Sequence, residues 1–214
     1  MDLYKVKQNQ RIVSERIGKE VKMDDFCLSM DYLKTIHRRL FEGIYPLTGE
    51  FRNFNMTKRE LLLNGNSVNY SDCRNIYKDL FKVIIVEYNK DYTNMDIEDV
   101  VKSISRLAVG IWKTHPFMDG NTRTVAVFIQ EYLNSLGYKV SNNIFKDNYL
   151  YFRSSLVKAS YENKEFLIEP DISCLERFFY KVLVDNSIEL DIDDVYIDGI
   201  VKLNTGKKRA LTKD

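Results

Sequence analysis

Apolar side chains recur about every three to four residues over most of this chain, and residues that break helices are scarce. Only 9 glycines and 3 prolines occur among the 214 residues, so long stretches have no local reason to leave a helical path. A chain with this pattern buries its apolar stripes by packing helix on helix. The sequence therefore predicts a mainly α-helical fold with a single core, since the length is typical of one domain.

The apolar spacing predicts helices along most of the chain. They cover residues 29–41, 71–88, 94–114, 121–136, a stripe over 145–156 and a last stretch over 170–182. The helix that follows Ser71 is expected to have an apolar face that carries Ile76, Tyr77, Leu80, Phe81 and Ile84. Gly137 stands directly after one of these helices, in the position where a left-handed residue commonly ends a helix.

Residues 61–68 carry the clearest signal for a β-hairpin. Asn64 and Gly65 lie between apolar residues, and an Asn-Gly pair is typical of the two-residue turn that joins antiparallel strands. An exposed hairpin offers a strand edge with which an extended partner segment can pair. A covered hairpin that packs its own leucines is equally consistent with the sequence. In either case the sequence predicts one β-hairpin within an otherwise helical chain.

Charge and cysteine usage argue against several classes of protein. The 32 basic residues nearly balance the 31 acidic ones, so the net charge gives no reason to expect binding to nucleic acid or to a membrane. The 3 cysteines are far apart and lack metal-ligand spacing, as in a reduced intracellular protein. The N-terminus has no signal-peptide pattern, and no apolar run reaches membrane-spanning length. We therefore expect a cytoplasmic protein.

The stretch from His115 to Arg123 is the most informative for function. It reads His-Pro-Phe-Met-Asp-Gly-Asn-Thr-Arg and lies between two predicted helices. A Gly-Asn pair at the start of a helix leaves backbone N–H groups free to bind an anion, which the helix dipole also favours. Around this position are an imidazole that can accept a proton, a carboxylate (Asp119) that can bind a hard metal ion, and a guanidinium that can bind phosphate. These are the groups that phosphoryl or nucleotidyl transfer requires.

This stretch resembles the signature of the Fic (filamentation induced by cyclic AMP) family, H-x-F-x-[DE]-G-N-G-R-x-x-R. The positions that match it are His115, Phe117, Asp119, Gly120, Asn121 and Arg123. Two positions differ, because Thr122 stands where the family usually has glycine and Ala126 where it has the second arginine. Residues 33–52 resemble the opening of the same domain, so the resemblance covers about the middle two-thirds of the chain.

The resemblance implies a Fic-type helical domain in which the motif loop joins two central helices and a β-hairpin flap lies beside it. On this basis residues 29–185 form the catalytic domain, with the flap near 56–69 and the motif at 115–123. Residues 1–28 form an N-terminal helical or irregular extension, and residues 186–214 form a C-terminal extension with a basic tail.

The resemblance further implies a protein adenylyltransferase, which transfers AMP from ATP to a Tyr, Thr or Ser hydroxyl of a protein or of the enzyme itself. His115 would act as the general base, Asp119 as a ligand of Mg²⁺, and Phe117 as the apolar anchor of the motif. The residues expected to bind the nucleotide phosphates are Gly120, Asn121, Thr122 and Arg123. ATP is the expected substrate and Mg²⁺ the expected cofactor. The alanine at position 126 is expected to weaken or re-orient nucleotide binding.

The expected partner is a protein with a hydroxyl side chain that docks on the flap. The flap residues expected to contact it are Leu62, Leu63, Asn64 and Gly65. Many family members carry an inhibitory helix with the pattern [ST]-x-x-x-E-[GN], and no glutamate of this chain has Ser or Thr at that spacing. We therefore expect no such restraint within the chain. The sequence leaves open whether a homo-oligomer or a separate inhibitory partner restrains the protein.

Two other interpretations of the motif stay open. Transfer of a different nucleotide, or of a phosphate group, uses the same kinds of side chain. A degenerate, non-catalytic module that binds a nucleotide or a partner would account for the departures at Thr122 and Ala126. Tyr149 and Arg153 lie on a helix that borders the adenine pocket in the family, but we expect a core tyrosine and a solvated arginine here.

Overall fold

Helices make up nearly all the regular secondary structure of the computed structural model, which describes residues 3–20, 26–197 and 200. Its α-helices are α1 (Leu3–Glu20), α2 (Met30–Phe41), α3 (Ile76–Tyr88), α4 (Ile97–Thr114), α5 (Asn121–Ser135), α6 (Asn142–Asp147), α7 (Tyr149–Lys158) and α8 (Ser173–Leu183). Short 3₁₀ turns occur at η1 (Leu61–Leu63), η2 (Cys73–Asn75) and η3 (Ile192–Val195). The predicted mainly helical fold is confirmed. Within the described residues, no helix is long and apolar enough to cross a bilayer.

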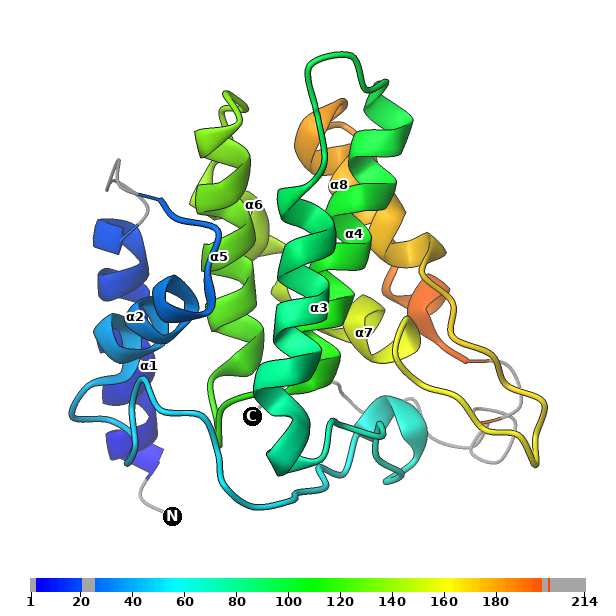
Figure 1. The fold of residues 1–214 in the computed structure, drawn as a ribbon. Helices are drawn as coiled ribbons and strands as arrows, with labels where there is room; N and C mark the ends of the chain where they lie inside the picture. Colours follow the sequence, from blue (N-terminus) through cyan, green and yellow to red (C-terminus); the bar gives the residue numbers. More distant parts are fainter. Residues whose placement is uncertain (1–2, 21–25, 198–199, 201–214) are drawn as a thin grey trace.

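Helices α4 and α5 lie at the centre of the molecule, and other helices pack on both sides of them (Figure 1). Helix α4 contacts α3, α5, α7 and α8, whereas α2 packs on α5 and α1 packs on α2. Fully buried side chains such as Trp112 and Phe128 fill the core between these helices. Because the loop 115–120 joins α4 directly to α5, the motif lies at one end of this central pair.

Capping side chains define where the helices around the motif begin and end. The Ser29 hydroxyl accepts a hydrogen bond from the Tyr32 N–H at 3.1 Å and starts α2, as predicted. Helix α4 begins at Ile97 rather than near residue 94, because the Asp96 carboxylate accepts the Asp99 N–H at 2.9 Å and forms the cap. Gly137 follows α5 with a φ of +93°, which confirms its predicted left-handed conformation.

Helix α3 differs from the prediction at its start and on its exposed face. The 3₁₀ turn η2, capped by Asp72, precedes the helix, so Ser71 is not the cap. Tyr77 and Phe81 were expected inside, but they are 55% and 56% exposed. The other predicted residues, Ile76, Leu80 and Ile84, are buried, because α4 covers that side of the helix.

The chain termini and the C-terminal helices refine the predicted boundaries. The stripe over 145–156 forms two helices, α6 and α7, which meet at Asn148. The acidic segment 191–199 contains the 3₁₀ turn η3. Helix α1 forms most of the predicted N-terminal extension. The basic tail, in particular residues 206–209, lies outside the described residues.

The predicted β-hairpin at residues 61–68 is wrong. Its Asn64-Gly65 turn does form, since both residues have positive φ values of 52° and 90°. The residues before the turn form the 3₁₀ turn η1, and the described part of this segment contains no strand. Leu62 and Leu63 are both buried and point inward together, which the alternating side-chain directions of a strand do not allow. An Asn-Gly pair thus predicted the turn correctly but not the structure of its flanks.

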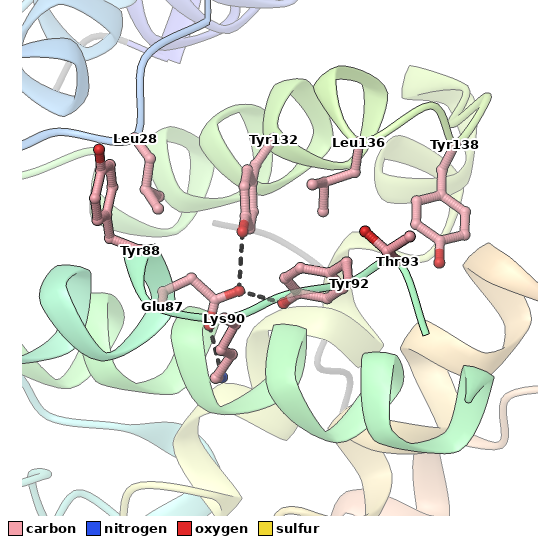
Figure 2. Close-up of a pocket in the computed structure, with 9 residues that line it drawn as sticks. All are labelled: Leu28, Glu87, Tyr88, Lys90, Tyr92, Thr93, Tyr132, Leu136 and Tyr138. Atoms are coloured by element: carbon pink, nitrogen blue, oxygen red, sulfur yellow. Dashed lines mark hydrogen bonds and ion pairs between the residues drawn. The ribbon is translucent and has the colours of Figure 1, made fainter. Parts of the chain in front are cut away.

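A buried polar network connects α3, α4 and α5 at the end of the bundle opposite the motif. Glu87 is only 2% exposed, and its carboxylate accepts hydrogen bonds from Tyr132 at 3.1 Å, from Lys90 at 2.7 Å and from Tyr92 (Figure 2). Ser103 of α4 donates to the same carboxylate at 3.1 Å. Both carboxylate oxygens are satisfied, so this network is a structural connection among the three helices.

Candidate active site

The loop between α4 and α5 is held by a buried arginine that lies far away in sequence. His115 ends α4 in the left-handed region, with φ 49° and ψ 57°. The Arg52 side chain donates from Nε to the His115 carbonyl at 2.8 Å, and the Arg52 N–H donates to the Pro116 carbonyl at 2.8 Å. Sequence analysis placed Arg52 only in the domain opening and missed this role. Its contacts join residues more than sixty positions apart, which no local pattern reveals.

Asn121 closes the loop from the other side. Its side-chain oxygen accepts the Phe117 N–H at 3.0 Å, and its side-chain nitrogen donates to the Phe117 carbonyl at 2.7 Å. Asn121 is almost fully buried. The amide group was expected to donate to a phosphate, but in this structure it shapes the loop instead. Phe117 is also buried, in agreement with its predicted role as the apolar anchor.

Gly120 is required at its position for two independent reasons. It caps α5 in the left-handed region, with a φ of +76°, which L-residues with a side chain rarely adopt. A Cβ atom at this position would lie 2.5 Å from Cε2 of Phe41. The glycine therefore lets the start of α5 approach α2 closely.

His37 of α2 contacts the motif loop and helps to fix its position. The Gly49 N–H donates to Nδ1 of His37 at 2.9 Å, so Nε2 carries the proton and donates to the Asp119 carbonyl at 3.0 Å. The imidazole also stacks on the Phe117 ring, with centroids 3.9 Å apart. Burial lowers the pKa of His37 to about 4, so the ring is neutral at physiological pH. The signal for this positioning residue was a histidine on an otherwise apolar helix face.

The His115 side chain is covered by a tyrosine that directly follows the flap. His115 is 3% exposed, and its ring stacks on Tyr70 with a centroid distance of 3.9 Å. Neither ring nitrogen has a hydrogen-bond partner among the described residues. Burial first, and then the positive charges of Lys58 and Arg52, lower the pKa of His115 to about 3. The imidazole is therefore neutral at physiological pH, with one nitrogen that carries a proton and one that can accept a proton.

Asp119 offers a carboxylate beside the start of α5. One oxygen accepts the Gly120 N–H at 2.7 Å and lies 3.4 Å from Nζ of Lys58. The side chain is 49% exposed, and the described residues contain no group of three or more metal-ligating side chains. Mg²⁺ is commonly bound by one or two carboxylates together with substrate phosphates, so this half-exposed carboxylate fits such an ion.

Arg123 lies one turn into α5 and faces a cleft with its guanidinium held in place. Nη2 donates to the Tyr45 hydroxyl at 2.8 Å, and the guanidinium carbon lies 4.7 Å from the centroid of the Phe41 ring. The cleft has a volume of about 800 Å³ and lies between α1, α5 and α6. Its lining includes Val13, Asp119, Arg123, Ala126, Lys146 and Tyr149. Tyr149 is 40% exposed and lines the cleft, so the expected core role for this residue is wrong.

The first turn of α5 offers further hydrogen-bond donors beside the motif loop. The first intrahelical hydrogen bond runs from the Thr124 N–H to the Gly120 carbonyl, so the preceding N–H groups are left for a ligand. Thr122 accepts a hydrogen bond from the Trp112 indole at 2.9 Å, which leaves its hydroxyl proton free to donate. Ala126 lies one turn further along and lines the cleft without adding charge.

The flap, residues 56–69, is joined to the body of the protein by a buried ion pair. Arg153 lies 2.7 Å from the Glu60 carboxylate, which is almost fully buried. Arg153 was expected to be solvated, and that expectation is wrong. The Tyr70 hydroxyl approaches the same carboxylate at 3.4 Å. This pair holds the flap against α7 while the ring of Tyr70 covers His115.

Of the predicted motif residues, Asp119 and Arg123 line the cleft, and the others lie in the same loop or in the first turn of α5. The structure separates the flap residues from one another. Leu62 and Leu63 are buried, whereas Asn64 and Gly65 are exposed at the turn. The segment that follows α2 runs across the end of the bundle where α4 and α5 are joined (Figure 1).

Similar folds occur among solved bacterial proteins. BepC from Bartonella tribocorum, with bound AMPPNP, has a TM-score of 0.66 and 13% identity, over 84% of this chain and 86% of that one. The Fic domain of Bep8 from Bartonella sp. 1-1C has a TM-score of 0.63 and 17% identity, over 85% and 88%. A Bartonella quintana Fic domain with bound ADP has a TM-score of 0.57 and 15% identity, over 82% and 85%.

Comparison at the level of sequence identifies the family. No curated protein matches the chain, which agrees with the low identities to the solved structures. The model of the Fic/DOC family matches residues 27–133, half of the chain, and this range contains both α2 and the whole motif. The chain therefore belongs to the Fic/DOC family.

Proposed function

We propose that this protein is a Mg²⁺-dependent adenylyltransferase that transfers AMP from ATP to a Tyr, Thr or Ser hydroxyl of a protein. The observation that carries this proposal is the placement of the motif loop at the end of an 800 Å³ cleft. Asp119, Arg123 and the start of α5 border that cleft, and His115 lies in the same loop. The nucleotides AMPPNP and ADP in two structures of similar fold support a nucleotide as its ligand.

The chemistry requires one proton acceptor and several stabilising charges. The hydroxyl oxygen of the target would attack the α-phosphorus of ATP, the bond to pyrophosphate would break, and a ring nitrogen of His115 would take the hydroxyl proton. Arg123 and the free N–H groups at the start of α5 would bind phosphate oxygens. Gly120, Asn121 and Thr122 would shape or donate to the same surface, so most of the catalysis would come from positioning and charge.

Asp119 is the residue that would hold Mg²⁺ together with the nucleotide. The ion would neutralise phosphate charge when bound. The protein's own contribution is to fix the position of the Asp119 carboxylate. Two hydrogen bonds do so, since its backbone carbonyl accepts from His37 and its side chain accepts from the Gly120 N–H.

The flap would present the target hydroxyl to His115. Pairing of the target with an edge strand is not available here, because the described part of the flap contains no strand. The exposed residues at its turn, Leu61, Asn64 and Gly65, would provide the contact instead. Because Tyr70 covers His115, docking of the target would also have to displace this ring.

A non-catalytic module that binds nucleotide is the second candidate, and one observation favours it. His115 is buried, and Ala126 leaves the cleft without a second arginine. This combination fits a site that binds a nucleotide but does not catalyse its transfer. The two candidates differ in what they predict for His115. If the protein transfers AMP, loss of the His115 imidazole would abolish transfer but would leave nucleotide binding intact. If the protein only binds nucleotide, loss of the imidazole would leave its binding function unchanged.

Transfer of labelled phosphate from ATP separates these candidates. The purified chain is incubated with Mg²⁺ and a protein extract, once with ATP labelled at the α-phosphate and once with ATP labelled at the γ-phosphate. We expect protein labelling from the α-phosphate only, and a decrease of about 10²-fold or more in His115→Ala. Labelling from the γ-phosphate would indicate phosphoryl transfer. ATP binding without any labelling, equal in the wild type and His115→Ala, would favour the non-catalytic module.

A further inference from the structure

Lys58 is a charged flap residue that sequence analysis did not connect with the motif. Its backbone N–H donates to the Ser67 hydroxyl at 3.1 Å, which fixes this part of the flap. Its ammonium group lies 3.4 Å from the Asp119 carboxylate and is partly exposed. The charge of Lys58 is also, after burial, the largest influence that lowers the pKa of His115. The ammonium group therefore contacts the proposed metal ligand, and its charge also acts on the proposed base.

The cleft contains little other positive charge for a polyanionic ligand. Among the lining residues only Arg123 and Lys146 are cationic, and Ala126 adds none. Arg123 is already oriented by Tyr45 and Phe41, so its guanidinium has a fixed position. Lysine instead has a flexible four-carbon stem and a compact charge that can follow a ligand. Lys58 is not among the lining residues, but its ammonium group contacts Asp119, which is one of them.

The contact between Lys58 and Asp119 is suited to exchange. The carboxylate is half exposed, and pairs of this kind contribute little to stability because water screens both charges. A divalent ion that arrives with a nucleotide competes for the same carboxylate oxygen, since Mg²⁺ prefers such oxygens. The flexible side chain of Lys58 would then let the displaced ammonium group reach the phosphates that accompany the ion.

We propose that Lys58 is a phosphate-binding residue whose ammonium group pairs with Asp119 in the nucleotide-free protein and moves to the nucleotide phosphates when these occupy the site. This inference rests on the proposed function, because it takes a nucleotide as the ligand. It assigns to the flap a share in nucleotide binding besides its contact with the target. It also supplies a positive charge beside Asp119, in a cleft where position 126 has none.

Calorimetric titration with ATP and with adenosine, each in the presence of Mg²⁺, tests this role. The variants are Lys58→Gln, which removes the charge, and Lys58→Arg, which keeps it. Lys139→Gln serves as the matched control, because Lys139 is exposed and does not line the cleft. We expect Lys58→Gln to weaken ATP binding by about 10-fold and to leave adenosine binding unchanged. Lys58→Arg and Lys139→Gln should bind ATP within about 3-fold of the wild type.

Each outcome bears on a different proposal. Equal ATP affinity in Lys58→Gln and the wild type would overturn the role of Lys58 and leave the proposed function intact. A parallel loss of ATP and adenosine binding in Lys58→Gln would indicate a structural role and would also overturn it. If the wild type binds neither ligand, the proposed function fails and the inference fails with it. Melting temperatures of all variants, recorded alongside, identify any variant that has lost its fold.

Discussion

The His115 imidazole, which is the proposed general base, is covered by a tyrosine ring. Its ring is buried against Tyr70 and its nitrogens have no partner among the described residues. A buried imidazole with a pKa of about 3 is neutral, as a base must be, but its affinity for a proton is low. Removal of the covering ring would hydrate the imidazole and raise that affinity. We therefore expect Tyr70 to limit access to His115 and to help keep the pKa of its ring low.

Replacement of Tyr70 tests this control directly. In Tyr70→Ala we expect the pKa of His115 to rise by about 2 units, because water reaches the charged form of the ring. The measurement is an NMR titration of the histidine ring protons, which is simple because the chain has only 2 histidines. Tyr70→Phe keeps the ring and should leave the pKa unchanged, and His37 provides an internal reference. A pKa that stays the same in Tyr70→Ala would show that Tyr70 does not shield His115.

At the scale of the helices, local patterns predicted the elements well but not the contacts that hold the site. Apolar spacing predicted α2, α4 and α5, and the cap at Ser29 predicted the start of α2, because these signals depend on neighbours within one helical turn. The β-hairpin was wrong because an Asn-Gly pair specifies a turn and says nothing about what flanks it. Arg52 and His37 were missed as site residues because their partners lie elsewhere in the chain. The motif positions themselves were predictable, since their spacing within nine residues is local.

The junction between α2 and α5 gives a prediction for stability. Gly120→Ala forces a residue with a side chain into the left-handed region and places its Cβ against Phe41. We expect the free energy of unfolding to fall by about 2–4 kcal/mol, from backbone strain and overpacking together. Urea denaturation provides the measurement. Gly65→Ala is the matched control, because its φ is +90° but no atom lies within 4 Å of the added carbon.

In Gly65→Ala the free energy of unfolding should fall only by the cost of backbone strain, about 1 kcal/mol. The difference between the two variants therefore isolates the contact between α5 and Phe41. Equal losses in Gly120→Ala and Gly65→Ala would mean that the approach of α5 to α2 does not require a glycine. Because Arg123 also lies over Phe41, a larger loss in Gly120→Ala should be accompanied by weaker ATP binding.

In the molecule as a whole, the two ends of the central helix pair contain different buried polar groups. One end has a hydrogen-bonded carboxylate, and the other has two neutral histidine rings. At one end the Glu87 carboxylate has all its partners, and burial together with that carboxylate raises the pKa of Tyr92 and Tyr132. At the other end, His37 and His115 are buried beside the motif and are kept neutral by burial. At the first end, hydrogen bonds satisfy the buried carboxylate. At the second end, stability depends on the protonation state of the two histidine rings. The stability of the whole fold is therefore tied to pH through the functional end.

The sign of this dependence follows from the direction of the two shifts. Both pKa values are lower in the folded protein, about 4 for His37 and about 3 for His115, than the value of about 6.5 in an unfolded chain. Between these values the unfolded state binds more protons than the folded state, so stability falls as pH falls. The carboxylates with lowered pKa values, such as Asp171, lose their contribution only below about pH 4. The histidines therefore dominate between pH 7.5 and 5.5.

Denaturation with urea at pH 7.5 and at pH 5.5 measures this effect. We expect the free energy of unfolding to fall by about 1 kcal/mol for each histidine over this interval, and thus by about 2–3 kcal/mol in total. His37→Gln and His115→Gln should each remove about half of the difference, because each deletes one titrating ring. Tyr70→Ala should also reduce it, since a hydrated His115 titrates in both states. Stability that is equal at the two pH values would mean that neither ring is held neutral by the fold.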